Sequence, residues 1–207
     1  WRRHSSPAFL RGSTWPVCSR GRTPVLVELF DDIILDFTDK VWYTLKNRVK
    51  EYITMINILF ICHGNICRSP MAEFVMKNLV SKAGLENRFH IESAATSTEE
   101  VGSPVYPPAR RKLAEHGIGC AGKTARQLKK CDYDQYDLLI GMDRANLRNM
   151  QRICGGDCDG KMHLLMEYTS APRDVAAPWY TGDFETTWRD VLAGCQGLLQ
   201  AVKEGGL

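Results

Sequence analysis

Short apolar runs alternate along the chain with longer segments in which apolar residues recur every three or four positions. The first run, residues 56–61, is β-branched and aromatic with almost no polar interruption, which is typical of a strand buried on both faces of a parallel sheet. Runs at residues 89–94, 136–143 and 161–166 predict three more strands, and the run at 136–143 leads directly into a helix.

The segments between these runs have the spacing of amphipathic helices. Helices are predicted at residues 71–83 and 107–116, which end at Gly84 and Gly117, from residues 123–128 onward, after the capping Asp143, and at residues 184–202 after the capping Asp183. Strands that alternate with helices predict an α/β fold, in which a small four-stranded parallel sheet carries helices on both faces. A ligand is expected at the carboxyl end of the first strand. The apolar stripe of the last helix is assigned to the core: Trp188, Val191, Leu192, Cys195, Leu198 and Leu199.

The first strand leads into a compact loop that reads CHGNICR from Cys62 to Arg68, followed by a Ser-Pro pair. Gly64 and Asn65 can take the positive φ angles that turn successive backbone N–H groups toward one centre. A helix is predicted to start at the Ser-Pro pair with the Ser69 hydroxyl as its cap, so that its positive end also faces the loop. The segment is therefore predicted to be a phosphate-binding loop after strand one.

Cys62 is the predicted nucleophile, because the N–H dipoles, the helix terminus and the Arg68 cation all favour its thiolate. The planar fork of Arg68 can hold two oxygens of a phosphoryl group, and Ser69 can donate to the sulfur when it leaves. This pattern indicates phosphoryl transfer through a cysteinyl-phosphate. The alternative is that Cys62 and Cys67 are merely small buried residues, but then the strand, the turn and the helix start would be in register by coincidence. A second hypothesis is redox control through a reversible Cys62–Cys67 disulfide.

From residue 55 to about residue 202 the sequence resembles the low-molecular-weight protein tyrosine phosphatases, through this loop and the segments that follow it. The resemblance implies that phosphate is bound by the loop residues His63, Gly64, Asn65, Ile66 and Cys67. It also implies that Ser93, in the segment SAATST, supports Asn65 by a hydrogen bond. Two positions depart from the family pattern: Glu99 stands near the place of a substrate-lining aromatic residue, and Lys123 replaces a histidine that many relatives carry behind the loop.

The resemblance further locates a mobile loop whose Asp-Pro pair carries the general acid, and here Ala177 precedes the proline. Protonation of a leaving phenolate, whose pKa is about 10, typically contributes about 10²–10⁴-fold to the rate. Asp174 lies too far upstream to replace the acid, and Asp183 is better explained as the helix cap. Trp179 and Tyr180 stand where relatives place aromatic residues that flank the cleft, with ordinary loop packing as the alternative. The chain is therefore expected to bind substrate with impaired turnover, as a substrate trap does.

Three classes of function remain open. The first is a phosphotyrosine phosphatase, active or impaired. The second comprises protein-arginine phosphatases and thiol-dependent arsenate reductases that share this loop; it is disfavoured, because the former carry threonine at the position of Ile66 and no cysteine pair suited to an arsenate relay is evident. The third is a non-catalytic phosphotyrosine-binding module, which Ala177 keeps open.

Composition narrows the choice of partner and compartment. The 207 residues are 44% hydrophobic and carry a net charge of +3; residues 1–54 supply all of it, so the rest gives no indication of a nucleic-acid partner. The 8 cysteines lack the dense spacing of a secreted disulfide scaffold. Cys154 and Cys158, with His163 nearby, do not have the spacing of a zinc site. We expect a cytoplasmic monomer without metal or cofactor that acts on phosphotyrosine-containing proteins or peptides.

Residues 1–54 are expected to be an N-terminal extension outside the family domain, which would comprise residues 55–207. The first 23 residues contain five arginines and no acid, and the apolar residues 24–37 are interrupted by four acidic residues, too many to span a bilayer. Residues 39–53 can form a helix. The extension is therefore predicted to be poorly ordered or partly helical, and dispensable for folding.

Overall fold

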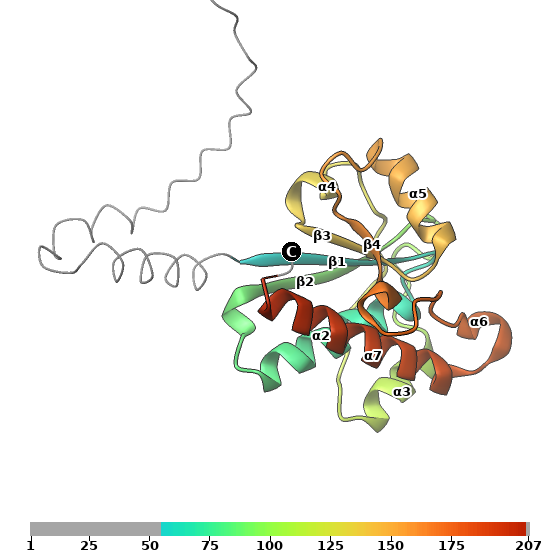
Figure 1. Cartoon of the computed structure of the whole chain (residues 1–207). Helices are drawn as coiled ribbons and strands as arrows, with labels where there is room; N and C mark the ends of the chain where they lie inside the picture. Colours follow the sequence, from blue (N-terminus) through green and yellow to red (C-terminus); the bar gives the residue numbers. More distant parts are fainter. Residues whose placement is uncertain (1–54, 206–207) are drawn as a thin grey trace, which may run out of the picture. The chain divides into compact units, whose positions relative to one another are not determined.

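Four strands form one parallel sheet in residues 55–205, the part of the chain that the computed structural model describes. They are β1 (Ile56–Cys62), β2 (Phe89–Ala95), β3 (Leu138–Gly141) and β4 (Met162–Leu164), and their spatial order is β2-β1-β3-β4 (Figure 1). Each strand pairs in parallel with its neighbours. The predicted α/β fold is confirmed, whereas the predicted extension, residues 1–54, lies outside the described residues.

The carboxyl end of β1 is a topological switch point of the sheet, because β2 pairs with one edge of β1 and β3 pairs with its other edge. The register places Cys62 opposite Ala95 of β2 and Ile61 opposite Gly141 of β3, so the three strands end at the same level. Open α/β sheets bind ligands at such a switch point. The loop after β1 therefore lies where a ligand is expected.

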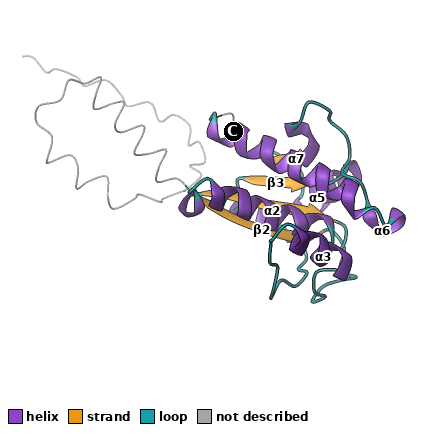
Figure 2. Ribbon diagram, turned by 90° about the horizontal axis from the view of Figure 1, so that it is seen from below, coloured by secondary structure: helices purple, strands orange, loops and turns teal. Residues whose placement is uncertain are grey.

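Side chains of β1 alternate between two cores, as the period of a strand requires. Ile58 and Phe60 belong to the core covered by α2 (Arg68–Lys82), α3 (Pro107–Glu115) and α7 (Phe184–Lys203). Leu59 and Ile61 belong to the core covered by α4 (Asp132–Gln135) and α5 (Arg144–Cys154). Figures 1 and 2 show α2 and α7 side by side across the first face. The predicted covering of both faces is confirmed.

Two of the three predicted N-terminal caps are present. Asp143 accepts a hydrogen bond from Asn146 N at the start of α5, and Asp183 accepts one from Thr186 N at the start of α7. The apolar stripe of α7 lies in the core as predicted, with Leu192 partly buried and the other five side chains buried. Although α7 has 20 residues, no helix within residues 55–205 is long and apolar enough to cross a bilayer.

The prediction of a helix from residues 123–128 onward is wrong. This segment is extended and lies beside the end of β2, where Ala95 N donates to Arg126 O at 2.7 Å and Leu128 N donates to Ala95 O at 2.8 Å. Its residue types favour a helix locally. The backbone groups at the end of β2, however, need hydrogen-bond partners, and the segment supplies them.

Two local predictions about the loop after β1 are also wrong. Helix α2 begins at Arg68 with Cys67 as its N-cap residue, and no described side chain caps it, so Ser69 is not the cap. Of the two residues expected to have positive φ angles, only Asn65 does, at 57°. Gly64 instead lies close to another side chain, since a Cβ atom there would be 3.2 Å from Cγ of Glu100, which would have to shift slightly. The other strand and helix ends differ from prediction by at most three residues, and β4 turns early into a 3₁₀ helix, Leu165–Tyr168.

Candidate active site

The loop between β1 and α2 surrounds the sulfur of Cys62, the last residue of β1, which is 3% exposed. The backbone N–H of Asn65 donates to Sγ at 3.3 Å, and Oγ of Ser69 lies 3.0 Å from the same atom. The left-handed conformation of Asn65 turns its N–H inward. Ser69, although not a helix cap, is thus beside the sulfur, where sequence reasoning expected its hydroxyl to act.

Two features contribute positive potential near this sulfur. Helix α2 starts directly after the loop with no acidic residue in its first turn and no cap from a described side chain, so its first N–H groups are available to the loop. Arg68 adds a full charge. The second cysteine of the loop is Cys67. Burial, and then the neighbouring Cys62, raise the pKa of its thiol to about 12, although Arg68 acts in the opposite direction. Cys67 is therefore a neutral thiol at physiological pH.

Arg68 is held from two directions. Its Nη1 donates to Oδ2 of Asp143 at 2.7 Å and to the backbone oxygen of Val175 at 3.5 Å. The other carboxylate oxygen of Asp143 caps α5. Since a guanidinium has five N–H donors, this arrangement leaves others for the oxygens of a phosphoryl group. Sequence reasoning identifies Asp143 only as a cap; its second contact spans 75 residues and follows from β3 ending beside β1.

A buried hydrogen-bond network supports the loop from behind. Nδ2 of Asn65 donates to Oγ of Ser69 at 2.9 Å and to Oγ of Ser93 at 2.7 Å. Ser93 in turn donates to Oε2 of Glu73 at 2.6 Å, and Nζ of Lys123 lies 2.8 Å from that oxygen. The predicted contact between Ser93 and Asn65 is present. Sequence reasoning missed Glu73, whose signal is an acidic residue on the inward face of α2.

Aromatic side chains lie along one side of the loop. Tyr106 and Phe184 pack against the apolar side chains of the loop, and the ring centroids of Tyr106 and Trp179 are 5.2 Å apart. Trp179 is 57% exposed, and Tyr180 follows it in α6 (Pro178–Thr181). An exposed aromatic ring beside an anion-binding loop is suited to contact a phenyl ring. Tyr106 is one of the aromatic residues beside the loop, and sequence reasoning missed it.

Acidic side chains lie near another part of the loop. Oε2 of Glu99 is 3.2 Å from Nε2 of His63, and both side chains are well exposed. Glu100 approaches the backbone of Gly64 and is partly buried. The structure therefore brings Glu99 to the loop only through the His63 side chain. Glu100 is a carboxyl group beside the loop that sequence reasoning missed.

The segment that carries Ala177 reaches the loop through Val175. The N–H of Val175 donates to the backbone oxygen of Met142, just after β3, at 2.8 Å, and its own oxygen accepts from Arg68. Ala177 follows two residues later, directly before α6. Oδ1 of Asp174 accepts from the backbone N–H of Arg144 at 3.2 Å.

A buried carboxylate on α7 holds the same segment. Asp190 is 2% exposed and accepts two hydrogen bonds from the Arg173 guanidinium, at 2.7 and 2.6 Å. It also accepts from Ala176 N at 3.0 Å, while Oγ1 of Thr187 donates to Ala176 O at 3.0 Å. The backbone that leads to Ala177 is therefore anchored on α7.

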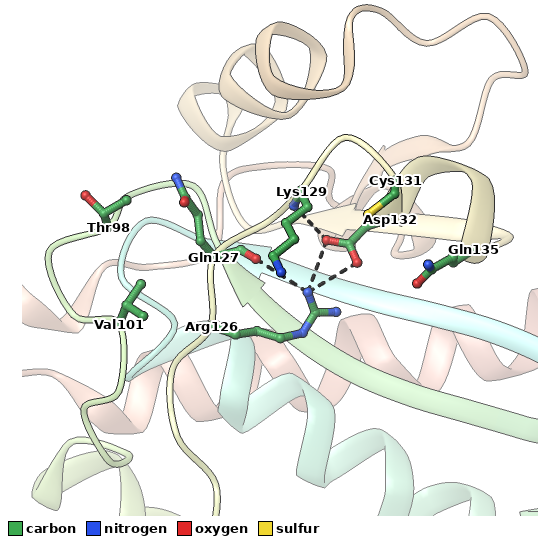
Figure 3. Close-up of a pocket in the computed structure, with 8 residues that line it drawn as sticks. All are labelled: Thr98, Val101, Arg126, Gln127, Lys129, Cys131, Asp132 and Gln135. Carbon is green, nitrogen blue, oxygen red and sulfur yellow. Dashed lines mark hydrogen bonds and ion pairs between the residues drawn. The ribbon is translucent and has the colours of Figure 1, made fainter.

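A hollow lies beside the support of the loop, lined by Thr98, Val101, Arg126, Gln127, Lys129, Cys131, Asp132 and Gln135 (Figure 3). It includes neither Cys62 nor Arg68, so it is separate from the candidate reaction centre. The Arg126 guanidinium donates to Asp132 at 3.1 and 3.3 Å, and the Arg126 backbone N–H donates to Oδ1 of Asn65 at 3.1 Å. This hollow therefore shares Arg126 with the support of the loop.

A protein-family model matches nearly all of the described residues. The family is described as low molecular weight phosphotyrosine protein phosphatase, and the match covers residues 57–206. The chain belongs to this family. The predicted resemblance to the low molecular weight phosphotyrosine protein phosphatases is thus confirmed.

Low molecular weight phosphotyrosine protein phosphatases of known sequence are similar over nearly their whole length. The low molecular weight protein-tyrosine-phosphatase YfkJ of Bacillus subtilis is 36% identical over 152 residues, which is 72% of this chain and 97% of YfkJ. The low molecular weight phosphotyrosine protein phosphatase of Gallus gallus is 38% identical over 149 residues, 70% of this chain and 94% of the relative.

Solved structures of the same fold agree. The crystal structure of YfkJ superimposes with a TM-score of 0.72 at 34% identity, over 74% of this chain and 98% of YfkJ. The crystal structure of a drosophila arginine phosphatase superimposes with a TM-score of 0.65 at 27% identity, over 70% of this chain and 97% of that protein. The fold of the low molecular weight phosphotyrosine protein phosphatases therefore also occurs in a protein named as an arginine phosphatase.

Proposed function

We propose that this chain is a phosphotyrosine-protein phosphatase that reacts through a cysteinyl-phosphate on Cys62, and that Ala177 lowers its turnover by standing at the general-acid position. The observation that carries the proposal is the loop itself: the Cys62 sulfur, the Asn65 N–H, the Ser69 hydroxyl and the start of α2 converge, with Arg68 beside them. Phosphotyrosine-containing proteins or peptides are the proposed substrates, as the name of the family indicates.

In the first step, the phosphoryl group of the substrate binds in the loop. Backbone N–H groups and the remaining donors of Arg68 stabilise its oxygens. The Cys62 thiolate attacks phosphorus, so that a sulfur–phosphorus bond forms while the bond to the tyrosine oxygen breaks. The departing phenolate takes its proton from water in this chain, because Ala177 has no acidic group.

In the second step, water attacks the cysteinyl-phosphate and inorganic phosphate is released. The sulfur–phosphorus bond breaks, and Cys62 leaves as a thiolate. Oγ of Ser69, 3.0 Å from Sγ, is placed to stabilise that leaving thiolate. A carboxylate at the general-acid position would act here as the base that activates water. With Ala177 at that position, the cysteinyl-phosphate is expected to persist.

The carboxylates closest in sequence to Ala177 have other partners. Asp174 accepts from a backbone N–H of α5, and Asp183 uses both oxygens to bind Thr186, at 2.8 and 2.6 Å. Loss of the general acid lowers kcat on phenolic substrates by about 10²–10⁴, or roughly 3–5 kcal/mol of transition-state stabilisation. Binding of the phosphoryl group depends on the loop and Arg68, so it is retained.

The Ala177→Asp variant, assayed beside the natural chain, tests the proposal, and Ala177→Asn is the matched control for size and polarity. We expect Ala177→Asp to raise kcat on a phosphotyrosine peptide by about 10²–10⁴ and Ala177→Asn to leave it unchanged. The affinity of all three proteins for inorganic phosphate should be the same. If Ala177→Asp were no faster than the natural chain, the assignment of the acid position would be wrong.

A non-catalytic phosphotyrosine-binding module is the second candidate, because Ala177 removes a group needed for turnover but not for binding. An activated nitrophenyl phosphate separates the two candidates. Its leaving group is acidic and needs little protonation, so a phosphatase releases nitrophenol repeatedly, whereas a binding module retains phosphopeptide and releases none. Phosphoarginine is a less favoured substrate, because Ile66 offers no hydroxyl at the position of the threonine expected in arginine phosphatases.

A further inference from the structure

Glu73 is a buried carboxylate with three partners. It lies on α2, and its side chain is 4% exposed. Oε1 accepts from Nζ of Lys77 at 2.6 Å, and Oε2 lies 2.8 Å from Nζ of Lys123 and accepts from Oγ of Ser93 at 2.6 Å. A buried carboxylate keeps its charge only where cations and hydrogen bonds compensate for lost hydration. Lys123 is the more buried of the two cations, with 13% of its side chain exposed against 44% for Lys77.

The charge of Glu73 fixes the direction of the hydrogen bond at Ser93. An ionised carboxylate can only accept, so the hydroxyl proton of Ser93 must point to Glu73. The oxygen of Ser93 is then an acceptor on its other side, where Nδ2 of Asn65 donates at 2.7 Å. Lys123 also donates to the backbone oxygen of Ser93 at 3.2 Å, which holds that residue in place.

The side chain of Asn65 passes the same donor-to-acceptor direction of hydrogen bonding on to the next residue. Its Oδ1 accepts from the backbone N–H of Arg126 at 3.1 Å, which decides which end of the amide carries the two protons. Figure 3 shows the Arg126 side chain paired with Asp132, which anchors that residue. Nδ2 of Asn65 therefore faces both serines, and its second proton goes to Oγ of Ser69 at 2.9 Å.

The last member of the chain is the hydroxyl of Ser69. Because its oxygen accepts from Asn65, its own proton is free to point to Sγ of Cys62, 3.0 Å away. We propose that Glu73 and Lys123 are positioning residues: by keeping a negative charge at one end of this buried chain, they orient the Ser69 O–H toward the sulfur at the other end. This inference rests on the proposed function of Cys62 as nucleophile.

The consequence is a hydrogen bond that is always donated to the sulfur when the sulfur is anionic. Such a bond favours the thiolate before attack and again when Cys62 leaves phosphorus. If the charge at Glu73 is lost, Ser93 can reverse its proton and Asn65 loses an acceptor. The Ser69 hydroxyl is then free to turn away from the sulfur.

The test compares Glu73→Gln and Lys123→Met with the natural chain, and Lys77→Met is the matched control. Glu73→Gln keeps the size of the side chain but removes its charge. Lys123→Met removes the more buried cation; Lys123 lines a surface hollow with Lys77, so the change leaves no closed cavity. Lys77→Met removes the more exposed cation of the same carboxylate, which water replaces.

Two readouts are needed. The first is the pH midpoint for alkylation of Cys62 by iodoacetamide, followed by mass spectrometry of the peptide that contains Cys62. The second is kcat/KM for an activated nitrophenyl phosphate, measured at pH values below the alkylation midpoint of the natural chain. Glu73→Gln should raise the alkylation midpoint by about one pH unit and lower kcat/KM about tenfold, since each unit corresponds to a factor of ten. Lys123→Met should change both the alkylation midpoint and kcat/KM in the same direction, with a smaller effect. Lys123→Arg, which keeps the positive charge, should have the midpoint and kcat/KM of the natural chain. Lys77→Met should keep kcat/KM within about twofold of the natural value.

A purely structural ion pair would give another result. If Glu73→Gln and Lys123→Met lowered the melting temperature but left the midpoint and kcat/KM within about twofold of the natural chain, the inference would be overturned. If Glu73→Gln did not fold, Ser93→Ala would interrupt the same series of hydrogen bonds at the residue next to Glu73 in that series. It should raise the alkylation midpoint of Cys62 by the same amount. Failure of the proposed function is a separate outcome, because it would appear as activity in Cys62→Ser.

Discussion

Arg68 ends one segment of the candidate site and hydrogen-bonds to another, and the two segments differ in what they offer a substrate. The loop between β1 and α2 is held by a buried network that ends on Glu73, and it presents a sulfur and several N–H donors. The segment around Ala177 is held by the buried Asp190, but its side chain at the expected acid position is a methyl group. Both segments are thus held in place, but only the loop between β1 and α2 carries groups that can react with or bind a phosphoryl group.

The comparison shows that position and chemistry depend on different residues. Buried carboxylates on helices fix where each segment lies, whereas single side chains at its tip decide what it can do. An alanine at the proposed acid position therefore leaves the anchoring contacts intact. Binding of a phosphoryl group and proton transfer to its leaving group can accordingly be lost or restored separately.

The largest effect is expected in the first segment. Cys62→Ser should reduce turnover of any aryl phosphate to the background rate, because no other sulfur lies at the centre of the loop. The fold should be kept, since serine is close in size to cysteine, and circular dichroism checks this. Activity in Cys62→Ser would remove the proposed mechanism.

The next effect concerns Arg68, which lies between the two segments. Asp143→Asn removes the ion pair at 2.7 Å but keeps a good helix cap for α5. We expect kcat/KM to fall about tenfold or more, because a displaced guanidinium no longer matches the phosphoryl oxygens. The melting temperature should stay nearly unchanged. A large loss of stability with normal kinetics would show that Asp143 serves α5 alone.

The second segment should respond mainly in stability. Asp190→Asn leaves the buried side chain in place but weakens its bonds to Arg173 and Ala176, at an expected cost of about 1–3 kcal/mol. For a domain of this size each kcal/mol lowers the melting temperature by roughly 2–4 °C. Differential scanning calorimetry measures the shift. An unchanged melting temperature would mean that this anchor contributes little to the fold.

The smallest effect is expected at Cys67. Because burial and the neighbouring Cys62 raise its pKa to about 12, Cys67 stays a thiol at all pH values below about 10, and iodoacetamide should leave it unmodified between pH 5 and 9. Peroxide should instead oxidise Cys62, and the Cys67 thiol should resolve the sulfenic acid as a disulfide. Peptide mapping without a Cys62–Cys67 linkage would contradict this hypothesis.

The sequence was sufficient for most of the features that are local, although not for the cap of α2 or the φ angle of Gly64. The loop from Cys62 to Arg68 is contiguous, its strand and helix flank it directly, and its central asparagine does adopt the positive φ angle. The contacts of Arg68 with Asp143 and of Tyr106 with Trp179 join distant residues, and their residue types are common at caps and in cores. These contacts can be recognised only once the fold brings the distant segments together.

The failed helix prediction has a similar cause. Residues 123–128 contain good helix formers, and propensity alone favours a helix there. The end of β2 accepts this segment as an extended neighbour, so Lys123 and Arg126 reach Glu73 and Asn65 behind the loop. Tertiary hydrogen bonding decided the conformation, and the support of the loop depends on it.

The dependence of rate on the leaving group tests the central claim most directly. A series of aryl phosphates with leaving-group pKa values from about 7 to about 10 would be assayed with the natural chain and with Ala177→Asp. The kcat/KM of the natural chain, which reports formation of the cysteinyl-phosphate, should fall steeply as the leaving group becomes more basic, while that of Ala177→Asp should depend on it only weakly, so that the two kcat/KM values converge on the most acidic phenol. A shallow dependence in the natural chain would mean that another carboxyl group near the loop, such as Glu100, supplies the proton, and it would contradict the account of Ala177.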